Sequence, residues 1–484
     1  TLAGFDFGAR NNVTDPARAA YTANPSPLLP AAQFNPLGGP AFASDGRPNV
    51  YSTYPWAFAP RIGAAWTPAR LGGRTVLRAG LGMFYTTFGT TGIQQPGFSA
   101  QTPLAAGVNN FLTPVYTLSN PFDAITQPVG SSLGPNTFLG QNITFTNPNP
   151  GQPYVWRWNF NIQREISKDL VMEIGYMGSR GSKLLENRDL NFVPLEFLST
   201  SPQRDQANIN RLTANVRNPF AGLLPGTGIN GTNVAQEQLL RPYPQFSGNG
   251  GVRLDGQTSG WSNFHQMMVR VEKRYSSGFN FLANFSWQKM LEAVGRLNSA
   301  DPNLEYRISD EDRTFRFIVS GSYELPFGRG KAIGSNAGPW ANRLIGGWQI
   351  TGIWNTQSGP PVEWGNVIYL GGDLAWDSQN LNNSFNRSAF NTVAAQQLDR
   401  NRRFFNTRFS SYRAAGVNNV DASVIKNVPI TERVRFQLRG EAFNLINRPQ
   451  FNGPNLSPAD ANFARITSQA NLNRAIQLAA RVVF

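Results

Sequence analysis

Apolar and polar residues alternate with a period of two along much of this chain. The segment VWRWNFNIQREI at 155–166 places two tryptophans, a phenylalanine and an isoleucine on every second position, with polar residues between them. The same alternation recurs in FNFLANFSW at 279–287 and in FRFIVSGSYEL at 315–325. A period of two sends alternate side chains to opposite faces of a β-strand. These segments therefore predict strands with one apolar and one polar face.

About a dozen segments carry this pattern between turn-forming residues. We predict strands at 2–9, 56–66, 75–86, 155–166, 169–179, 263–275, 279–290, 313–325, 346–357, 419–427, 433–446 and 473–484. Most of them span about nine to fourteen residues, whereas strands of globular sheets usually span about five or six. Strands of the greater length fit a tilted crossing of a membrane.

Short and long connections separate these strands in turn. The short ones are at 67–73, 167–169, 276–278 and 428–432, and the long polar ones are near 10–55, 87–154, 180–262, 358–418 and 447–472. The segment at 326–345 falls on the short side but is longer than the others, so it is a partial exception. Alternating short turns and long loops are typical of outer-membrane barrels. The sequence predicts an all-β fold, a transmembrane antiparallel up-and-down β-barrel with about twelve strands here and long extracellular loops.

Aromatic residues on the apolar faces fall near both ends of the predicted strands. Trp56, Trp158, Tyr176, Trp287 and Trp354 are toward the long loops, and Trp66, Tyr275, Tyr323 and Phe484 are toward the short turns. Indole and phenol rings favour the two interfaces between membrane and water. We predict that these residues form two membrane-interface belts.

The opposite faces carry charge, most densely in RVRFQLRGEAFNLI at 433–446. A packed core does not hold charges at this density, but a water-filled lumen does. We expect Arg316, Arg433, Arg435 and Arg439 to face the lumen. There they would contact an anionic solute, dock a plug or be solvated, and the sequence leaves these alternatives open.

Composition narrows the class of protein further. The 484 residues include no stretch of about 18 apolar residues, which excludes membrane-spanning helices. Lys and Arg outnumber Asp and Glu by 43 to 29, but they are dispersed and no nucleic-acid motif is present, so we expect no nucleic-acid partner. Cys is absent, which excludes disulfides and thiolate sites. The chain begins at Thr1 without a recognisable signal peptide, which fits either a processed start or a portion of a longer protein.

Residues with catalytic or metal-binding chemistry are sparse. His265 is the only histidine, which excludes a histidine triad, and we interpret it as an ordinary strand residue. The acidic run from Asp310 to Arg313 has the ligands that Ca²⁺ prefers, but we favour the interpretation as a solvated loop with a local arginine partner. We nominate no catalytic residue, metal site or cofactor and predict that the protein is not an enzyme.

Several motifs together resemble a known family. They are FAPRIGAAWTP, TVLRAGLGMFY, WNFNIQREISKDLVMEIGYMGSRGSKL, DRTFRFIVSGSYELPFGRGK, GGWQITGIWNTQSG and VDASVIKNVPITERVRFQLRGEAFNLINRPQFNGP. In this order they are similar to the C-terminal barrel of TonB-dependent receptor-like proteins, in particular the Oar-like group of acidobacteria, whose members carry a carboxypeptidase-regulatory-like domain. The resemblance implies a barrel of about 22 strands closed by an N-terminal plug.

No plug, TonB-box-like segment or regulatory-like domain is recognisable in the sequence. We therefore expect residues 1–484 to be a single outer-membrane barrel region, the C-terminal portion of a larger receptor. The terminal Phe484, closing an amphipathic strand, resembles the signal read by the barrel assembly machinery.

The resemblance implies TonB-dependent uptake of an unidentified nutrient across the outer membrane of a Gram-negative bacterium. Surface adhesion through the long loops and a passive pore are the alternatives. The expected partners are outer-membrane lipid and lipopolysaccharide, the assembly machinery, the TonB complex through an N-terminal part, and an unknown solute.

Overall fold

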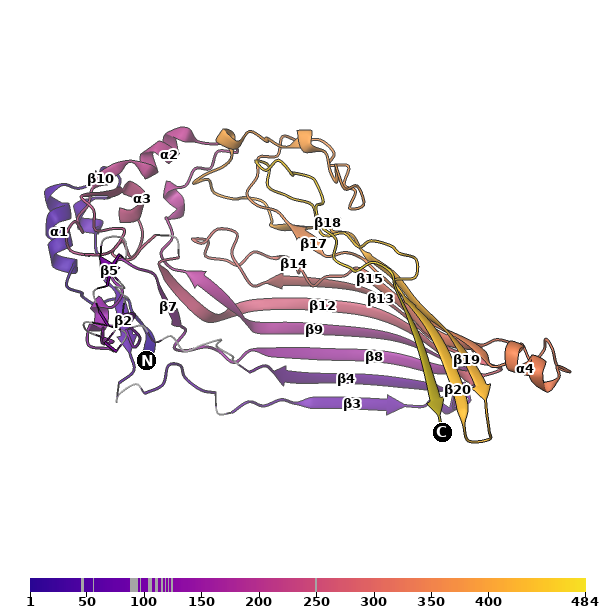
Figure 1. Ribbon diagram of the computed structural model, residues 1–484. Coiled ribbons are helices and arrows are strands. Elements are labelled where there is room, and N and C mark those ends of the chain that lie inside the picture. Colours follow the sequence, from indigo (N-terminus) through magenta and orange to yellow (C-terminus); the bar gives the residue numbers. More distant parts are fainter. Residues whose placement is uncertain are drawn as a thin grey trace.

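The fold is described by a computed structural model of the chain. It describes residues 1–44, 48–54, 56–87, 125–248 and 250–484, and also 95, 97–102, 107–108, 112–114, 116–117, 119–120 and 122. One long, curved antiparallel sheet dominates these residues, and loop-built caps lie over one of its ends (Figure 1).

The main sheet follows the chain in an up-and-down order. From one edge to the other its strands are β21 (Ala475–Val483), β20 (Arg435–Phe443), β19 (Val417–Pro429), β16 (Trp348–Gln357), β15 (Phe315–Glu324), β13 (Phe279–Ala293), β12 (Val252–Ser276), β9 (Leu170–Asp189), β8 (Tyr154–Ser167), β4 (Thr75–Tyr85) and β3 (Arg61–Trp66). Two short strands join off this path: β14 (Arg307–Ile308) pairs with β13, and β7 (Ile143–Thr146) runs parallel to β12. The predicted fold class is confirmed, and the four short connections join neighbouring antiparallel strands.

Eleven of the twelve predicted strands lie in this sheet, whereas the strand predicted at 2–9 forms outside it. That segment forms β1 (Leu2–Asp6), which pairs with β2 (Gly39–Phe42) in a separate two-stranded sheet. Leu2 is only 2% exposed because it packs into a hydrophobic core rather than facing a membrane. The predicted strand at 56–66 begins late, at Arg61, after Pro60, which has no N–H to donate to a strand partner.

Two strands extend well beyond their predicted ends. β9 has 20 residues and β12 has 25, and their upper parts pair with each other through three register irregularities. Residues 180–189 and 252–262 show no sustained alternation of apolar and polar residues, so periodicity does not reveal these parts. In Figure 1, where the strands run across the view, β9 and β12 extend beyond the neighbouring strands toward the caps.

The first cap is built from residues 1–42, 134–147 and 190–252. It contains α1 (Thr14–Ala23), α2 (Gln206–Thr213), α3 (Gln236–Leu239), β10 (Asn215–Arg217) and β11 (Asn233–Ala235), together with β1, β2 and β7. Its core includes the almost fully buried rings of Tyr21, Phe34, Phe145, Phe220 and Phe246. Aromatic burial of this extent gives the long loops a hydrophobic core of their own.

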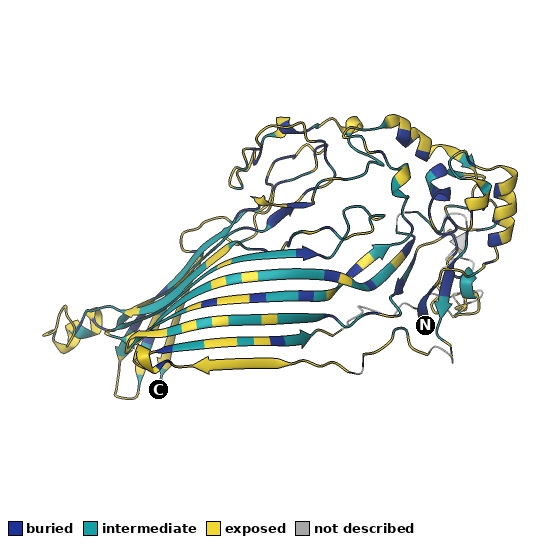
Figure 2. Cartoon of the chain, turned by 180° about the vertical axis from the view of Figure 1, so that it is seen from behind, coloured by how far each residue is buried: buried dark blue, intermediate teal, exposed yellow. Residues whose placement is uncertain are grey.

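The second cap is built from residues 358–415 and 447–470. Its regular elements are β17 (Pro361–Glu363), β18 (Arg408–Arg413) and short 3₁₀ turns. Trp364, Phe385, Phe390 and Phe463 form its buried centre. Figure 2 shows fully buried residues gathered in the caps, whereas most of the long sheet is intermediate or exposed. A further small hairpin pairs β5 (Gly107–Val108) with β6 (Thr113–Pro114).

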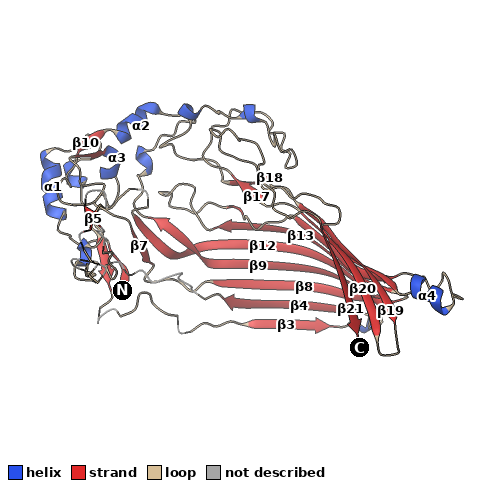
Figure 3. Cartoon of the chain, in the orientation of Figure 1, coloured by secondary structure: helices blue, strands red, loops and turns tan. Residues whose placement is uncertain are grey.

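The opposite end of the sheet carries the short turns and α4 (Pro339–Ile345), which lies far from the other labelled helices (Figure 3). None of the helices in the described part of the chain has the length and hydrophobicity of a bilayer crossing. At the sheet edges, β3 and β21 each have a single strand partner among the residues described. Every residue of β3 is exposed.

Candidate functional site

Strand register divides the main sheet into two chemically distinct faces. Ala283, Val319 and Trp354 are successive cross-strand partners on β13, β15 and β16, and they belong to an apolar face. Arg316 and Gln357 are partners on β15 and β16 and belong to the opposite, polar face. Because the register continues without slipping from β12 to β21 over most of each strand, each face is continuous across several strands. Such a division suits a wall between lipid and water.

Most of the predicted interface aromatics lie on the apolar face, and the exceptions are Trp56 and Tyr275. Tyr275 lies at the register irregularity between Lys273 and Ser276, where its hydroxyl hydrogen-bonds Glu324 of the polar face. Trp66, Trp158, Tyr176, Tyr275, Trp287, Tyr323 and Trp354 all belong to strands of the main sheet, whereas Trp56 precedes β3 and is 78% exposed outside any strand. Their assignment to two belts stays a prediction. Trp348 begins β16 on the same face and was not nominated, although its alternation with Ile350 and Trp354 in the predicted strand at 346–357 could have identified it.

The four predicted lumen arginines do not form one cluster. Arg316, Arg435 and Arg439 are on the polar face, but Arg433 precedes β20 and lies in the turn, so its predicted strand position is wrong. Following the cross-strand partners of Arg439 through β19 and β16 leads to Glu324 on β15, which is eight residues beyond Arg316. At roughly 3.3 Å per residue, Arg439 and Arg316 are therefore about 26 Å apart along the strand direction. A single anion site made of these arginines is therefore excluded.

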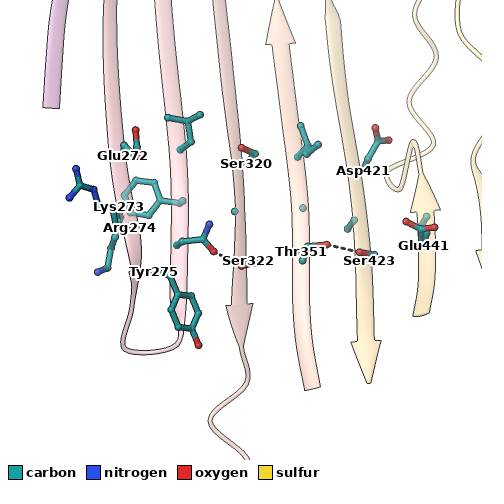
Figure 4. Close-up of a pocket in the computed structure, with 18 of the residues that line it drawn as sticks. Glu272, Lys273, Arg274, Tyr275, Ser320, Ser322, Thr351, Asp421, Ser423 and Glu441 are labelled. Atoms are coloured by element: carbon teal, nitrogen blue, oxygen red, sulfur yellow. Dashed lines mark hydrogen bonds between the residues drawn. The ribbon is translucent and has the colours of Figure 1, made fainter. Parts of the chain in front are cut away.

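The structure brings polar residues of several strands together around a hollow of about 600 Å³ on the concave face of the sheet. Its lining runs from β12 to β20 and is shown in Figure 4. The polar lining residues are Arg270, Glu272, Lys273, Arg274, Tyr275, Asn280, Ser320, Ser322, Thr351, Asp421, Ser423, Arg439 and Glu441. We call this surface the polar hollow.

Neighbouring side chains orient one another in the polar hollow. Arg439 Nη2 lies 2.6 Å from Glu441 Oε1, and the Thr351 and Ser423 hydroxyl oxygens lie 2.5 Å apart across β16 and β19 (Figure 4). Asp421 Oδ1 accepts from Asn419 Nδ2 at 2.9 Å and from the Asn444 backbone N–H at 2.8 Å. Donors and acceptors of both charges are thus held on rigid strands, an arrangement suited to a polar partner of mixed charge.

Buried ion pairs hold the second cap, and the loop that follows β13, at the long-loop end of the sheet. Arg408 on β18 contacts Glu292 on β13 at 3.0 Å and Glu363 on β17 at 2.6 Å. Arg296 contacts Glu186 at 2.6 Å, and both side chains are almost fully buried. Sequence reasoning missed these pairs, because their members lie about a hundred residues apart and carry no local motif.

The two caps also contact each other. Arg400 Nη2 in the second cap lies 3.0 Å from Glu237 Oε1 in the first, and this hydrogen-bonded pair raises the pKa of Arg400 above its usual value. The two caps therefore contact each other at the long-loop end of the sheet.

The acidic run at 310–313 is held by arginines. Asp312 is fully buried, 2.6 Å from Arg413 Nη2, and it accepts from the Met290 backbone N–H at 2.6 Å. Asp310 lies 3.5 Å from Arg408. The interpretation as a solvated loop with a local arginine partner is therefore wrong for Asp312, which is buried and pairs with the distant Arg413. His265 is exposed on β12, and its Nδ1 lies 2.7 Å from the Tyr176 hydroxyl.

Comparisons with known proteins identify a family and several solved structures that are similar to this chain. Residues 2–477 match the family described as Outer membrane beta barrel domain. Similar solved structures include the outer membrane transporter YddB from Escherichia coli, at 8% identity and a TM-score of 0.41 over 88% of this chain and 40% of that one. The FrpB iron transporter from Neisseria meningitidis has 10% identity and a TM-score of 0.38 over 88% of this chain and 38% of that one. The ferripyoverdine receptor of the outer membrane of Pseudomonas aeruginosa has 9% identity and a TM-score of 0.37 over 88% of this chain and 32% of that one.

The chain thus spans less than half the length of each of these three structures. No curated protein matches its sequence. The family match covers nearly the whole chain and agrees with the long amphipathic strands, the short turns and the apolar outer face. The protein belongs to the outer membrane beta barrel domain family and is located in the outer membrane.

Proposed function

We propose that this chain is part of the barrel wall of an outer-membrane receptor that takes up a solute by TonB-dependent transport. The observation that carries the proposal is the polar hollow, which lies on the side of the sheet opposite the apolar face. Oriented charges such as Asp421 and Glu441 are costly to bury unless water or a polar partner meets them. A transport lumen supplies both, and the resemblance of the strand motifs to TonB-dependent receptor-like proteins indicates the receptor class.

The proposal includes further strands that complete the barrel. Sheet edges cannot face lipid unpaired, because their N–H and C=O groups have no water to bind. β3 and β21 have such edges in the part of the chain that is described. A receptor barrel of about 22 strands would supply their partners. In that barrel, the hollow would face the lumen and the solute or a plug within it.

The caps then lie on the extracellular side and form the entrance to the lumen. Their hydrophobic cores also favour the second candidate, a surface-interaction protein, since folded loops present a fixed surface to a partner. The two candidates differ in which part of the protein matters. Uptake depends on the polar hollow, whereas adhesion depends on the caps alone.

The remaining partners belong to this proposal as well. Outer-membrane lipid and lipopolysaccharide would surround the apolar face, and the TonB complex would act through an N-terminal part. Phe484, which is 95% exposed after β21, would be read by the barrel assembly machinery. We propose no enzymatic reaction, no cofactor and no nucleic-acid partner.

The experiment is solute uptake by cells that express the full receptor gene. Uptake of iron complexes, copper and oligosaccharides is measured with and without a protonophore, in the natural protein and in an Asp421→Asn, Glu441→Gln variant. TonB-dependent transport predicts that the protonophore abolishes uptake and that the variant lowers it at equal abundance in the membrane. Persistent uptake with the protonophore would indicate a passive pore. Cell adhesion that survives the variant, without uptake of any solute, would favour the interaction protein.

A further inference from the structure

The connection between β15 and β16 is unlike the other turns at its end of the sheet. It spans residues 325–347 and contains α4, whose Trp340 and Leu344 side chains are 78% and 75% exposed. These two residues are four positions apart and therefore lie on the same face of the helix. A barrel needs only a short turn here, so the additional apolar surface requires a separate explanation.

The connection is folded and presents this surface in a fixed way. The Arg329 backbone N–H donates to Asn342 Oδ1 at 2.7 Å, which ties the beginning of the connection to the middle of α4. The Ile333 N–H donates to the Pro326 carbonyl at 2.9 Å. Pro339 occupies the first helical position, where its missing N–H costs nothing.

The C-terminal end of α4 is attached to the apolar face of the sheet. Lys426 Nζ on β19 donates to the Leu344 carbonyl at 2.9 Å and also to the Gly346 carbonyl. Trp348 Nε1 donates to the same Leu344 carbonyl at 2.9 Å. Lys426 and Trp348 are cross-strand partners on the apolar face. α4 is therefore fixed at the outer surface of the sheet, not at the polar hollow.

This attachment also resolves an electrostatic problem. A lysine on the lipid side of a barrel is costly, although less so near the interface. The last carbonyls of a helix carry partial negative charge and accept hydrogen bonds from cations. Lys426 is only 7% exposed because α4 covers its amine. The helix thus removes a charge from the lipid side and places its own apolar face there.

The exposed side of α4 combines the residue types that bind a membrane interface. The Arg343 guanidinium carbon lies 5.0 Å from the centroid of the Trp340 ring, and the neighbouring connection carries Arg329. Tryptophan favours the headgroup level, and arginine binds lipid phosphates beside it. Short amphipathic helices with this chemistry lie in the plane of the interface.

We propose that α4 is an interfacial anchor in the periplasmic leaflet of the outer membrane, with Trp340 and Leu344 in the acyl boundary and Arg343 at the lipid phosphates. The proposal rests on the apolar face of the sheet being in contact with lipid, as in the proposed barrel. We expect phospholipid to cover this surface, because the surface of α4 is continuous with the apolar face of the sheet through Trp348.

Site-directed spin labelling tests this directly, because the chain has no Cys and each introduced one is unique. The receptor that contains this chain, with any cysteine outside residues 1–484 replaced by serine, is reconstituted into vesicles of phosphatidylethanolamine and phosphatidylglycerol with a nitroxide on Leu344→Cys. Ala283→Cys, in the middle of the apolar face of β13, is the lipid reference. Ala395→Cys, exposed in the second cap, is the water reference. Relaxation by oxygen and by a water-soluble nickel complex then reports the immersion depth of each label.

The expected result is that the Leu344 label lies between the references, with an oxygen-to-nickel accessibility ratio severalfold above that of Ala395. An additional Trp340→Ser, Arg343→Ser change should move it toward the water value without altering the Ala283 label. If the Ala283 label is in lipid and the Leu344 label reads as water, the anchor is overturned and a periplasmic protein becomes the occupant to seek. If the Ala283 label itself reads as water in folded protein, the barrel proposal fails instead.

Discussion

Arg408 and Glu292 lie 116 positions apart in the sequence, yet their Nη1 and Oε1 atoms are 3.0 Å apart. Arg408 belongs to β18 of the second cap and Glu292 to the upper end of β13, and both side chains are largely buried. The pair therefore holds the second cap against the sheet. A buried pair of this kind contributes little net stability by itself, but breaking it leaves a charge without a partner in a dry environment.

We expect Arg408→Gln to loosen the second cap selectively. Among the described residues, Glu292 would still have Arg307, whose Nε lies 3.5 Å from Glu292 Oε1. The free energy that holds the cap closed should therefore fall by about 3 kcal/mol, at the low end of the range for broken buried pairs. Hydrogen exchange of residues 361–415 in the folded, detergent-solubilised protein measures it. Arg253→Gln is the control, because its pair with Asp255 is largely exposed and should contribute less than about 1 kcal/mol. Equal exchange in the two variants would contradict the role of the buried pair.

Gly178 on β9 should not tolerate a side chain. It is the cross-strand partner of Trp158, and a Cβ at this position would lie 2.3 Å from the indole Cε2. The ring would have to leave its place over the glycine, which should lower the free energy of unfolding of Gly178→Ala by about 1–3 kcal/mol. Denaturant titration followed by tryptophan fluorescence measures the change.

A matched glycine makes this prediction specific. Gly440 is on the same face, and a Cβ there would meet only Leu478 Cδ2, at 3.5 Å. Gly440→Ala should therefore be nearly neutral under the same conditions. A loss in Gly440→Ala as large as that in Gly178→Ala would show that strand glycines matter for their backbone alone and not for the aromatic packing.

The division of the sheet into two faces predicts opposite outcomes for neighbouring residues. Val319→Arg on β15 places a charge among Ala283 and Trp354, so it should cost about 2–4 kcal/mol if it lies near the middle of the membrane. Ser320→Arg, one residue further, adds a charge to the polar hollow and should cost much less. The fraction of heat-modifiable, folded protein on a gel, titrated with urea, measures both. Equal sensitivity at the two positions would exclude a lipid-facing surface on this side.

The sequence was sufficient to predict the strands of the main sheet because a barrel wall imposes one long, local pattern. Each strand carries its own apolar face, and the short turns between strands leave little freedom in pairing. Arg433 was misplaced because the alternation continues into the turn, while the ladder with β19 begins only at Arg435. Periodicity alone does not mark where a strand loses its partner.

The caps and the polar hollow could not be predicted from local sequence patterns. Phe34 packs with Phe220, and Trp364 lies against Phe390 in a core that also includes Phe463, so both cores come from distant residues in segments that have no periodicity. The hollow likewise depends on the curvature of the sheet, which brings β12 and β20 to face a common space. α4 was visible only as an overlong connection, since its attachment to Lys426 is a tertiary contact.

Acid should destabilise α2 in the first cap through Asp205. Its carboxylate accepts from the Asn208 backbone N–H at 2.9 Å and from the Ser199 hydroxyl at 2.7 Å, and chiefly the first of these holds the pKa of Asp205 below its usual value. Because the folded state favours the ionised form, this stabilisation is complete above the unfolded pKa of about 3.9 and is lost as the pH falls toward the lower folded pKa. Hydrogen exchange at 206–213, corrected for the intrinsic rate, should therefore rise below about pH 4. Asp205→Asn keeps a capping side chain that does not titrate, so its exchange should lack this rise. If it retains the same acid dependence, another group must control the unfolding of α2.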